Sequence, residues 1–173
     1  MPTIFSHTVI PIAIALGARR ISRRLLFTGM AASIAPDLDV AAFRFGIAYS
    51  HEFGHRGFSH SLVFALMLAI FAALFAPELR TKRMTAFIFI FVATASHGLL
   101  DMFTNGGLGV ALFWPYTDAR YFFPLRMIDV SPIGLRGFLG QAGIRALKSE
   151  LLWIWLPALI LGVAVYLHRR HSR

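Results

Sequence analysis

The segment SHGLLD, Ser96 to Asp101, places a histidine and an aspartate four residues apart at the end of a strongly apolar run. Residues i and i+4 lie on the same face of a helix, so His97 and Asp101 are spaced to bind one metal ion. The alternative is a His–Asp hydrogen bond that packs two helices together. Ionisable side chains are costly near a membrane span and usually functional there, which favours the metal ligands.

The segment PDLD adds two carboxylates, Asp37 and Asp39. They share a side only if the chain is extended, because on a helix they would lie about 200° apart. The alternatives are solvated acids after a helix ended by Pro36, or a cap for the next element. We predict that at least one of the two is a metal ligand. Either Asp37 or Asp39 is also our candidate for a catalytic ligand or base.

The segment HRGFSH contributes two imidazoles, those of His55 and His60. Gly57 permits a tight turn that would bring both to one centre. Alternatively, Ser59 caps the following helix and His60 is incidental; the two interpretations are compatible. Arg56 is a candidate to bind a phosphate or carboxylate in catalysis, although an arginine on its own more often snorkels at a surface.

His7, near the start of the first apolar run, is the last candidate ligand. His7, His60 and His97 each follow a serine, whose hydroxyl could orient the imidazole. His51 and Glu52 are predicted to be solvated loop residues, with extra ligands or a general base as the alternative, and His168 and His171 are predicted to lie in the basic tail outside the site.

The donor set limits the metal. The chain contains no cysteine, so disulfides and thiolate ligands are excluded. Imidazoles and carboxylates suit Zn²⁺, with Mn²⁺ or Fe²⁺ as alternatives. A single structural zinc takes four ligands, so a larger set predicts one or two ions with some groups in other roles. The candidate ligands are His7, Asp37, Asp39, His55, His60, His97 and Asp101.

The elements that position these residues are predicted to be membrane helices. Of 173 residues, 57% are hydrophobic and 14% are charged, against about 45–50% and about 25% in soluble domains. The alternative is an unusually hydrophobic soluble helical domain. Apolar runs predict helices over about 3–17, 25–35, 61–76, 83–103 and 151–168. The last three would reach roughly 24–31 Å, close to the thickness of a bilayer's hydrocarbon core. The first two are short, so they are tilted, longer than drawn, or partly inserted.

The chain is therefore predicted to be one all-α membrane domain over residues 1–173. The metal motifs fall within 6–107. The 104–149 connection is rich in aromatic residues and is predicted to lie at the membrane interface. The N-terminal segment lacks a basic stretch before its apolar part, so we interpret it as a retained helix rather than a signal peptide.

Basic residues predict the orientation. Three clusters, ARRISRR, ELRTKR and HRRHSR, lie between the first and second helices, between the third and fourth, and after the fifth. One alternating topology places all three on the cytoplasmic side, as basic loops prefer. The candidate ligands then gather on the opposite face. The net charge of +9 is thus explained by membrane orientation, and no nucleic-acid motif accompanies it.

The ordered motifs SH, PDLD, HRGFSHS and SHGLLDMFTNGG resemble the YdjM-like bacterial inner-membrane proteins, which are described as metal-dependent hydrolases. The resemblance covers residues 6 to about 107. It implies an inner-membrane location and a metal-dependent activity.

A more distant similarity is to zinc-dependent phospholipase C and the S1/P1 nucleases, which are all-helical. It implies that His7, Asp37 or Asp39, His55 or His60, His97 and Asp101 hold metal, with Asp101 as a bridging carboxylate. Those enzymes carry a further His, His and Glu set for a third ion. This chain has no histidine between Asp101 and His168, so at most two ions are implied.

Together these features predict a polytopic helical bundle of four to five apolar helices with a divalent-metal site at its outer face. The expected activity is hydrolysis of a phosphoester or other ester by metal-activated water. A phospholipid is the expected substrate because the site would open where headgroups lie. The alternatives are a proton- or metal-ion-coupled transporter and a non-catalytic metal-binding membrane protein. A transporter would be expected to show a repeated half and broken helices, and the sequence shows neither.

Overall fold

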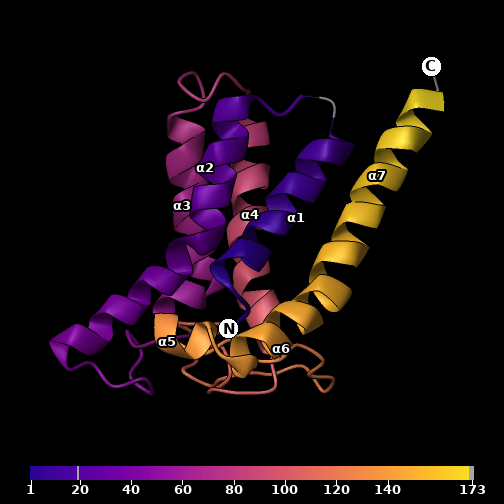
Figure 1. Ribbon diagram of the computed structural model, residues 1–173. Helices are drawn as coiled ribbons and strands as arrows, with labels where there is room; N and C mark the ends of the chain where they lie inside the picture. The colour runs from indigo at the N-terminus through magenta and orange to yellow at the C-terminus, as the bar shows by residue number, and fades with distance from the viewer. Residues whose placement is uncertain (19, 172–173) are drawn as a thin grey trace.

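The computed structural model describes residues 1–18 and 20–171. Five helices form an up-and-down bundle (Figure 1): α1 (Ile4–Gly17), α2 (Arg23–Ile34), α3 (Leu62–Leu74), α4 (Arg83–Met102) and α7 (Leu156–His171). The prediction of an all-helical chain is confirmed for the described residues, which contain no strand beyond two isolated bridges, Thr104–Ile128 and Val110–Tyr121.

Three helical stretches are long and apolar enough to cross a membrane, over residues 23–45, 83–102 and 141–171. Two more, α1 and α3, are apolar but shorter. Helix α4 is central and packs against α3, α2 and α1, whereas α7 packs mainly against α1. Buried alanines line the contact between α3 and α4, among them Ala69 and Ala86. Small side chains let the two backbones approach closely, as is common between membrane helices.

The second predicted helix is longer than expected. Helix α2 continues directly into the 3₁₀ helix η1 (Ala35–Phe45), which slants away from the foot of the bundle (Figure 1). Pro36 does not end the helix, because a proline in the first turn of a helical segment needs no backbone N–H donor there. The helix ends at Gly46, whose φ of 75° is left-handed.

The boundary of the last span also differs from the prediction. The connection after α4 contains the short helix α5 (Leu135–Phe138) and then α6 (Gln141–Glu150), which continues through the π turn η3 (Leu151–Trp155) into α7. The irregular part therefore ends near residue 140, and the final span does not begin at 151. Pro157 lies two residues after the end of the π turn. Because proline cannot donate the regular helical hydrogen bond, the widened turn just before it is physically reasonable.

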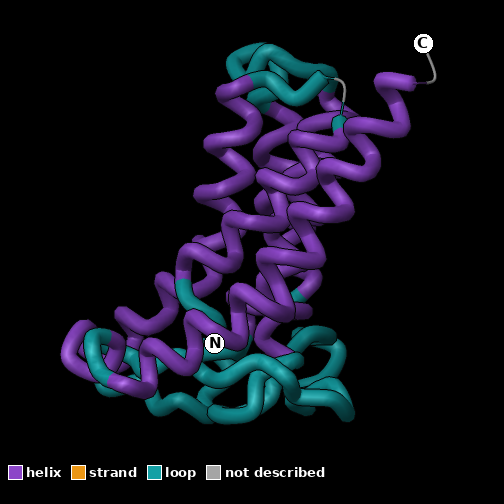
Figure 2. Tube along the Cα trace, turned by 45° about the vertical axis from the view of Figure 1, so that its right-hand side comes forward, coloured by secondary structure: helices purple, strands orange, loops and turns teal. Residues whose placement is uncertain are grey.

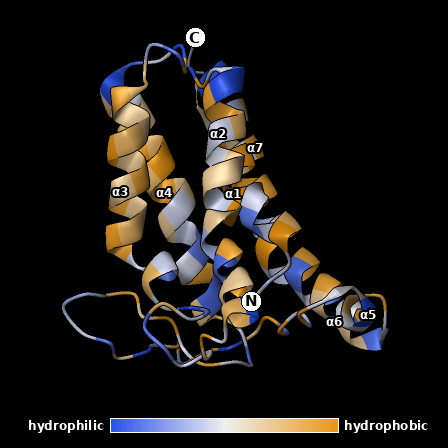
Figure 3. Ribbon diagram, turned by 90° about the vertical axis from the view of Figure 1, so that its left-hand side faces the viewer, coloured by the Kyte–Doolittle hydropathy of each residue, from blue (hydrophilic) through white to orange (hydrophobic). Residues whose placement is uncertain are grey.

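The two ends of the bundle differ (Figure 2). Short connections join the helices at one end, and the long 46–57 and 103–134 segments cover the other. The basic clusters lie at the short-loop end, together with the C-terminus; two of the basic residues assigned to them, Arg19 and Arg173, lie outside the described residues. Coloured by hydropathy, the helices are mostly apolar along their length and hydrophilic residues gather at the ends (Figure 3).

Candidate metal centre

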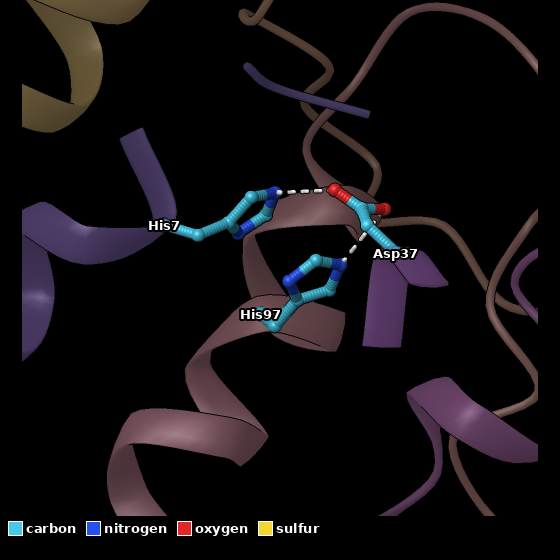
Figure 4. Close-up of side chains that lie close together, drawn as sticks. All are labelled: His7, Asp37 and His97. Carbon is cyan, nitrogen blue, oxygen red and sulfur yellow. Dashed lines mark ion pairs between the residues drawn. The ribbon is translucent and has the colours of Figure 1, made fainter. Parts of the chain in front are cut away.

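Helix α4 positions the two residues of SHGLLD as its periodicity predicts. His97 and Asp101 lie one turn apart and are both fully buried. The Nδ1 atom of His97 lies 2.7 Å from the carbonyl oxygen of Ser33, at the end of α2. A carbonyl only accepts, so Nδ1 carries the proton and Nε2 keeps its lone pair. That lone pair points to Asp37 (Figure 4), whose Oδ1 is 3.3 Å away.

The 3₁₀ geometry of η1 separates the two aspartates of PDLD. Asp37 turns toward α1 and α4, where its Oδ2 lies 4.0 Å from Nε2 of His7 (Figure 4). Asp39 turns the other way and lies against the back of the histidine turn, 2.6 Å from Nδ1 of His55. The two carboxylates therefore have different partners, although they are only two residues apart.

The turn over residues 52–60 depends on two conformations that the motif alone does not show. Arg56, rather than a glycine, adopts a left-handed φ of 64°. Gly57 is required for another reason, because a Cβ there would lie 2.0 Å from the carbonyl oxygen of Glu52. The turn leads into η2 (Phe58–His60), and Ser61 caps α3 by accepting a hydrogen bond from Phe64 N. The alternative that Ser59 caps this helix is therefore wrong.

Ser59 acts on the histidine that follows it. Its hydroxyl donates to Oδ2 of Asp39 at 2.6 Å, so its oxygen is free to accept from Nδ1 of His60 at 3.0 Å. The Nε2 atom of His60 then faces the cluster. Of the three serines predicted to orient the following imidazole, only Ser59 does so, since Ser6 donates to Glu150 and Ser96 donates to its own helix.

Asp39 thus fixes two rings at once. The Nδ1–H of His55 donates to one of its oxygens, and the other oxygen takes the Ser59 hydroxyl and the backbone N–H of Arg56 at 3.2 Å. A carboxylate behind an imidazole fixes the tautomer and raises the basicity of Nε2, an arrangement that recurs around protein-bound metals. Asp39 is placed as a positioning residue for His55 and His60.

Five residues converge on one small volume. The Nε2 atom of His60 lies 3.1 Å from that of His97, 3.5 Å from Asp101 Oδ2 and 3.8 Å from Asp37 Oδ1. The Nε2 atom of His7 lies 3.8 Å from Asp101 Oδ1, and its ring stacks on that of His97 with centroids 3.6 Å apart. Ligand atoms about 2.1 Å from a tetrahedral ion lie about 3.4 Å from each other, so these separations suit a shared cation.

The unpaired polar atoms of the cluster also favour a bound cation. Both ring nitrogens of His7, both carboxylate oxygens of Asp37 and Oδ1 of Asp101 are buried without a hydrogen-bond partner, whereas Oδ2 of Asp101 is ion-paired with Nε of Arg56. Leaving such groups unpaired costs roughly 1–3 kcal/mol each and more when they are charged. With neutral imidazoles, three carboxylates face the guanidinium of Arg56 and the amino group of Met1, so the cluster keeps a net negative charge that a divalent cation can balance.

The donor atoms form three overlapping groups that could each hold an ion: His7, Asp37 and His97; Asp37, His55 and His60; and His60, His97 and Asp101. Asp37 and His60 each belong to two groups. The arrangement thus fits one ion and has donors on the His55 side for a second.

Arg56 is buried at the edge of this cluster. Its Nε lies 2.9 Å from Asp101 Oδ2, and the rest of the guanidinium donates to the carbonyls of Gly106 and Leu108 and to the hydroxyl of Thr104. The predicted anion-binding role would require breaking these contacts. As placed, Arg56 orients Asp101 and ties the histidine turn to the loop after α4.

The surroundings of His60 favour its protonated form in the absence of a cation. Burial alone would lower the pKa of His60, but the carboxylates of Asp101, Asp37 and Asp39 outweigh it and raise the pKa to about 10. A bound cation must displace this proton, since Nε2 cannot both carry a hydrogen and bind a metal.

Glu150 is a buried carboxylate that the motifs did not reveal. It accepts from the backbone N–H and the hydroxyl of Thr3 and from the hydroxyl of Ser6, which also accepts from Trp155 Nε1. These contacts fix the first turn of α1, where Ser6 directly precedes His7. The only available signal was an acidic residue placed directly before an apolar span.

Arg120 is the second residue that the motifs missed. It donates to the carbonyls of His55, Tyr49 and His51 and so braces the turn from outside. The residues predicted to lie outside the site do so: His51 and Glu52 are exposed loop residues, and His168 and His171 lie at the far end of α7.

The fold and the cluster together define a helical membrane protein with a buried site of histidines and aspartates at one end of its bundle. The chain belongs to the family described as YdjM inner membrane protein, which matches residues 1–171. It is 40% identical to inner membrane protein YbcI of Escherichia coli (strain K12), over 98% of this chain and 100% of the relative. The family resemblance inferred from the motifs is thereby confirmed.

No solved structure matches the chain significantly. The similarity to phospholipase C and the S1/P1 nucleases therefore rests on the residue pattern alone.

Proposed function

We propose that this protein is a metal-dependent hydrolase of the inner membrane that holds one or two divalent cations, Zn²⁺ in the first instance. The supporting observation is the convergence of three imidazole Nε2 atoms and two carboxylates, with separations of 3.1–4.0 Å, in one buried cluster. When bound, such an ion polarises a phosphoryl or carbonyl oxygen and lowers the pKa of a coordinated water.

The chain's own residues have distinct tasks in this proposal. His7, His60, His97, Asp37 and Asp101 are the ligands. Asp39 holds the Nδ1 proton of His55, which leaves Nε2 of His55 able to bind a second ion or to accept a proton from an attacking water. Arg56 holds Asp101 in place.

Asp37 connects the cluster to the outside. His7, His97 and Asp101 are fully enclosed, whereas Asp37 keeps 7% of its surface accessible and lines an open groove. A substrate would therefore approach along η1 and the start of α1. We propose a membrane phosphoester as the substrate, since this end of the bundle carries amphipathic α6 beside the long apolar helices.

The orientation is also a proposal. The basic clusters lie at the short-loop end of the bundle and the metal centre lies at the opposite end. Basic loops favour the cytoplasm, which would direct the metal centre outward.

The test uses purified protein in detergent. Hydrolysis of bis(p-nitrophenyl) phosphate and of a phospholipid is measured after chelation and after return of Zn²⁺, Mn²⁺ or Mg²⁺. We expect cleavage that is lost on chelation, restored by one of these ions and lost in Asp37→Asn. The matched control is Asp118→Asn, an acid of the exposed loop outside the cluster.

Two outcomes would favour another function over the proposed hydrolase. Ion flux in reconstituted vesicles without cleavage would indicate a transporter, and stoichiometric metal without either activity would indicate a non-catalytic metal-binding protein. Cleavage that survives chelation, or that persists in Asp37→Asn, would remove the proposed centre from the reaction.

A further inference from the structure

One hollow reaches the buried cluster. It has a volume of about 390 Å³ and lies between the start of α1, the 3₁₀ helix η1 and the segment around α5. Its walls include Ile4, Phe5, Val40, Ile133 and Phe138, and Asp37 is the cluster residue that lines it. Its volume is within the range of small-molecule sites, about 300–1,000 Å³.

The lining is unsuited to a polar solute. Most of the wall is aliphatic or aromatic, and Phe5 and Ile133 are 60% and 51% exposed at the groove. A polar hollow exists at the same end of the molecule, lined by residues such as Glu52, Asp118 and Arg120, but no metal-cluster residue lines it. Of these two hollows in the described residues, the apolar one is therefore the one that reaches the cluster.

The surroundings of the groove match the boundary of a bilayer. Leu38 and Phe45 of η1 and Leu139 after α5 are each more than 70% exposed. Helix α6, which follows, carries exposed Arg145 and Lys148 together with exposed apolar side chains. Such a mixture is typical of helices that lie in the interface plane. An occupant could thus enter from the lipid phase without crossing water.

We infer that this groove binds an acyl chain of a membrane phospholipid and so presents the lipid's ester or phosphoester group to the centre at Asp37. The presentation of the ester to the centre rests on the proposed hydrolase function, but binding of the acyl chain does not require that function. The groove sets the substrate class as amphiphilic, with its apolar part held between α1 and the 131–138 segment.

Binding is tested without any reaction. The full-length protein is placed in nanodiscs that contain phosphatidylethanolamine with a diazirine at the end of one acyl chain, and labelled peptides are mapped after illumination. We expect label on residues 1–5 and 131–138. In Ile133→Trp, which fills the groove from an exposed position, this label should fall about tenfold, the lower end of what a hydrophobic pocket discriminates.

Matched variants separate the groove from the general membrane surface. Leu139→Trp adds the same bulk at a similarly exposed residue outside the lining and should leave the label unchanged. Label on 156–168, which faces lipid, serves as the internal reference. Equal labelling of 131–138 in wild type and Ile133→Trp, or an equal fall in Leu139→Trp, would overturn the inference.

Cleavage rates distinguish an error in the proposed acyl-chain groove from an error in the proposed hydrolase function. If the wild type cleaves both substrates, Ile133→Trp should lose about tenfold in rate on long-chain phospholipid and keep its rate on bis(p-nitrophenyl) phosphate. Equal losses on both substrates would count against the groove. If the wild type cleaves neither, the hydrolase fails, and the labelling result alone decides whether the groove binds the chain. His97→Ala should lose metal and retain the label.

Discussion

Two buried polar clusters lie at the same end of this bundle, and they are built differently. Around Glu150, three donors meet the two carboxylate oxygens, and the serine of the cluster also accepts from Trp155. In the candidate metal centre, the carboxylate of Asp37 and the ring of His7 have no hydrogen-bond partners, and Asp101 has one oxygen ion-paired with Arg56 and the other unpaired. Complete pairing indicates a structural device that fixes a helix end. Carboxylate oxygens in excess of the available donors are what a cation-binding site would present.

The largest expected effect separates the two clusters by metal content. His97→Ala removes a central metal-binding nitrogen and should weaken zinc binding by roughly two to four orders of magnitude, comparable to breaking a buried charged contact of about 3–5 kcal/mol. Metal analysis with competitive chelator titration measures this. His51→Ala, at an exposed loop position, is the matched control. Equal metal content in His97→Ala and wild type would show that the cluster is not the binding site.

The second prediction concerns pH. Because the neighbouring carboxylates raise the pKa of His60 to about 10, a metal ion must displace its proton at lower pH. The apparent affinity should therefore rise about tenfold per pH unit below that pKa, or about a hundredfold between pH 6 and 8. Titrations in buffers of different pH measure the slope. A flat profile would mean that His60 is not protonated in the metal-free protein or is not a ligand.

Asp39 tests the difference between the two clusters, because its carboxylate is fully hydrogen-bonded and yet lies beside the candidate metal ligands. Asp39→Asn should disturb the tautomers of His55 and His60 while leaving the ligand atoms present, which predicts a loss of about 10–100-fold in metal affinity. Asp129→Asn, whose carboxylate pairs with an asparagine on the exposed loop, is the control. An effect as large as that of His97→Ala would instead make Asp39 a direct ligand.

The smallest expected effect is on stability. Glu150→Gln replaces an acceptor of three hydrogen bonds with a group that can only partly satisfy them, and should destabilise the fold by about 1–3 kcal/mol. The loss should be the same with zinc and with chelator, and metal content should stay near the wild-type value. Thermal unfolding in detergent under both conditions measures it, with Glu78→Gln at the opposite end as control. A loss of stability seen only with zinc would show that Glu150 contributes to metal binding and that the two clusters act as one.

Local periodicity was sufficient to predict the parts of the centre that lie on one regular element. His97 and Asp101 share a face of α4 because a helix always stacks residues four apart. The convergence of His7, Asp37 and His60 with them followed from the alternation of apolar helices across a membrane. The structure brings all of these together.

What could not be predicted depends on contacts between distant segments. The 3₁₀ continuation of α2 decides that Asp37 faces the centre and Asp39 does not. The position of the Arg56 guanidinium depends on the loop after α4. The role of Glu150 requires knowing that the last long helix begins beside the start of α1.

Gly98 sits between the two ligands of α4, where a Cβ would come within 2.6 Å of the carbonyl oxygen of His60. A single added methyl at this position would force η2 away from the helix and pull His60 from its neighbours. Relatives can therefore be sorted from their sequences alone: a chain that keeps every histidine and aspartate but carries a larger residue here should lack the proposed ion or should hold His60 on a rearranged turn.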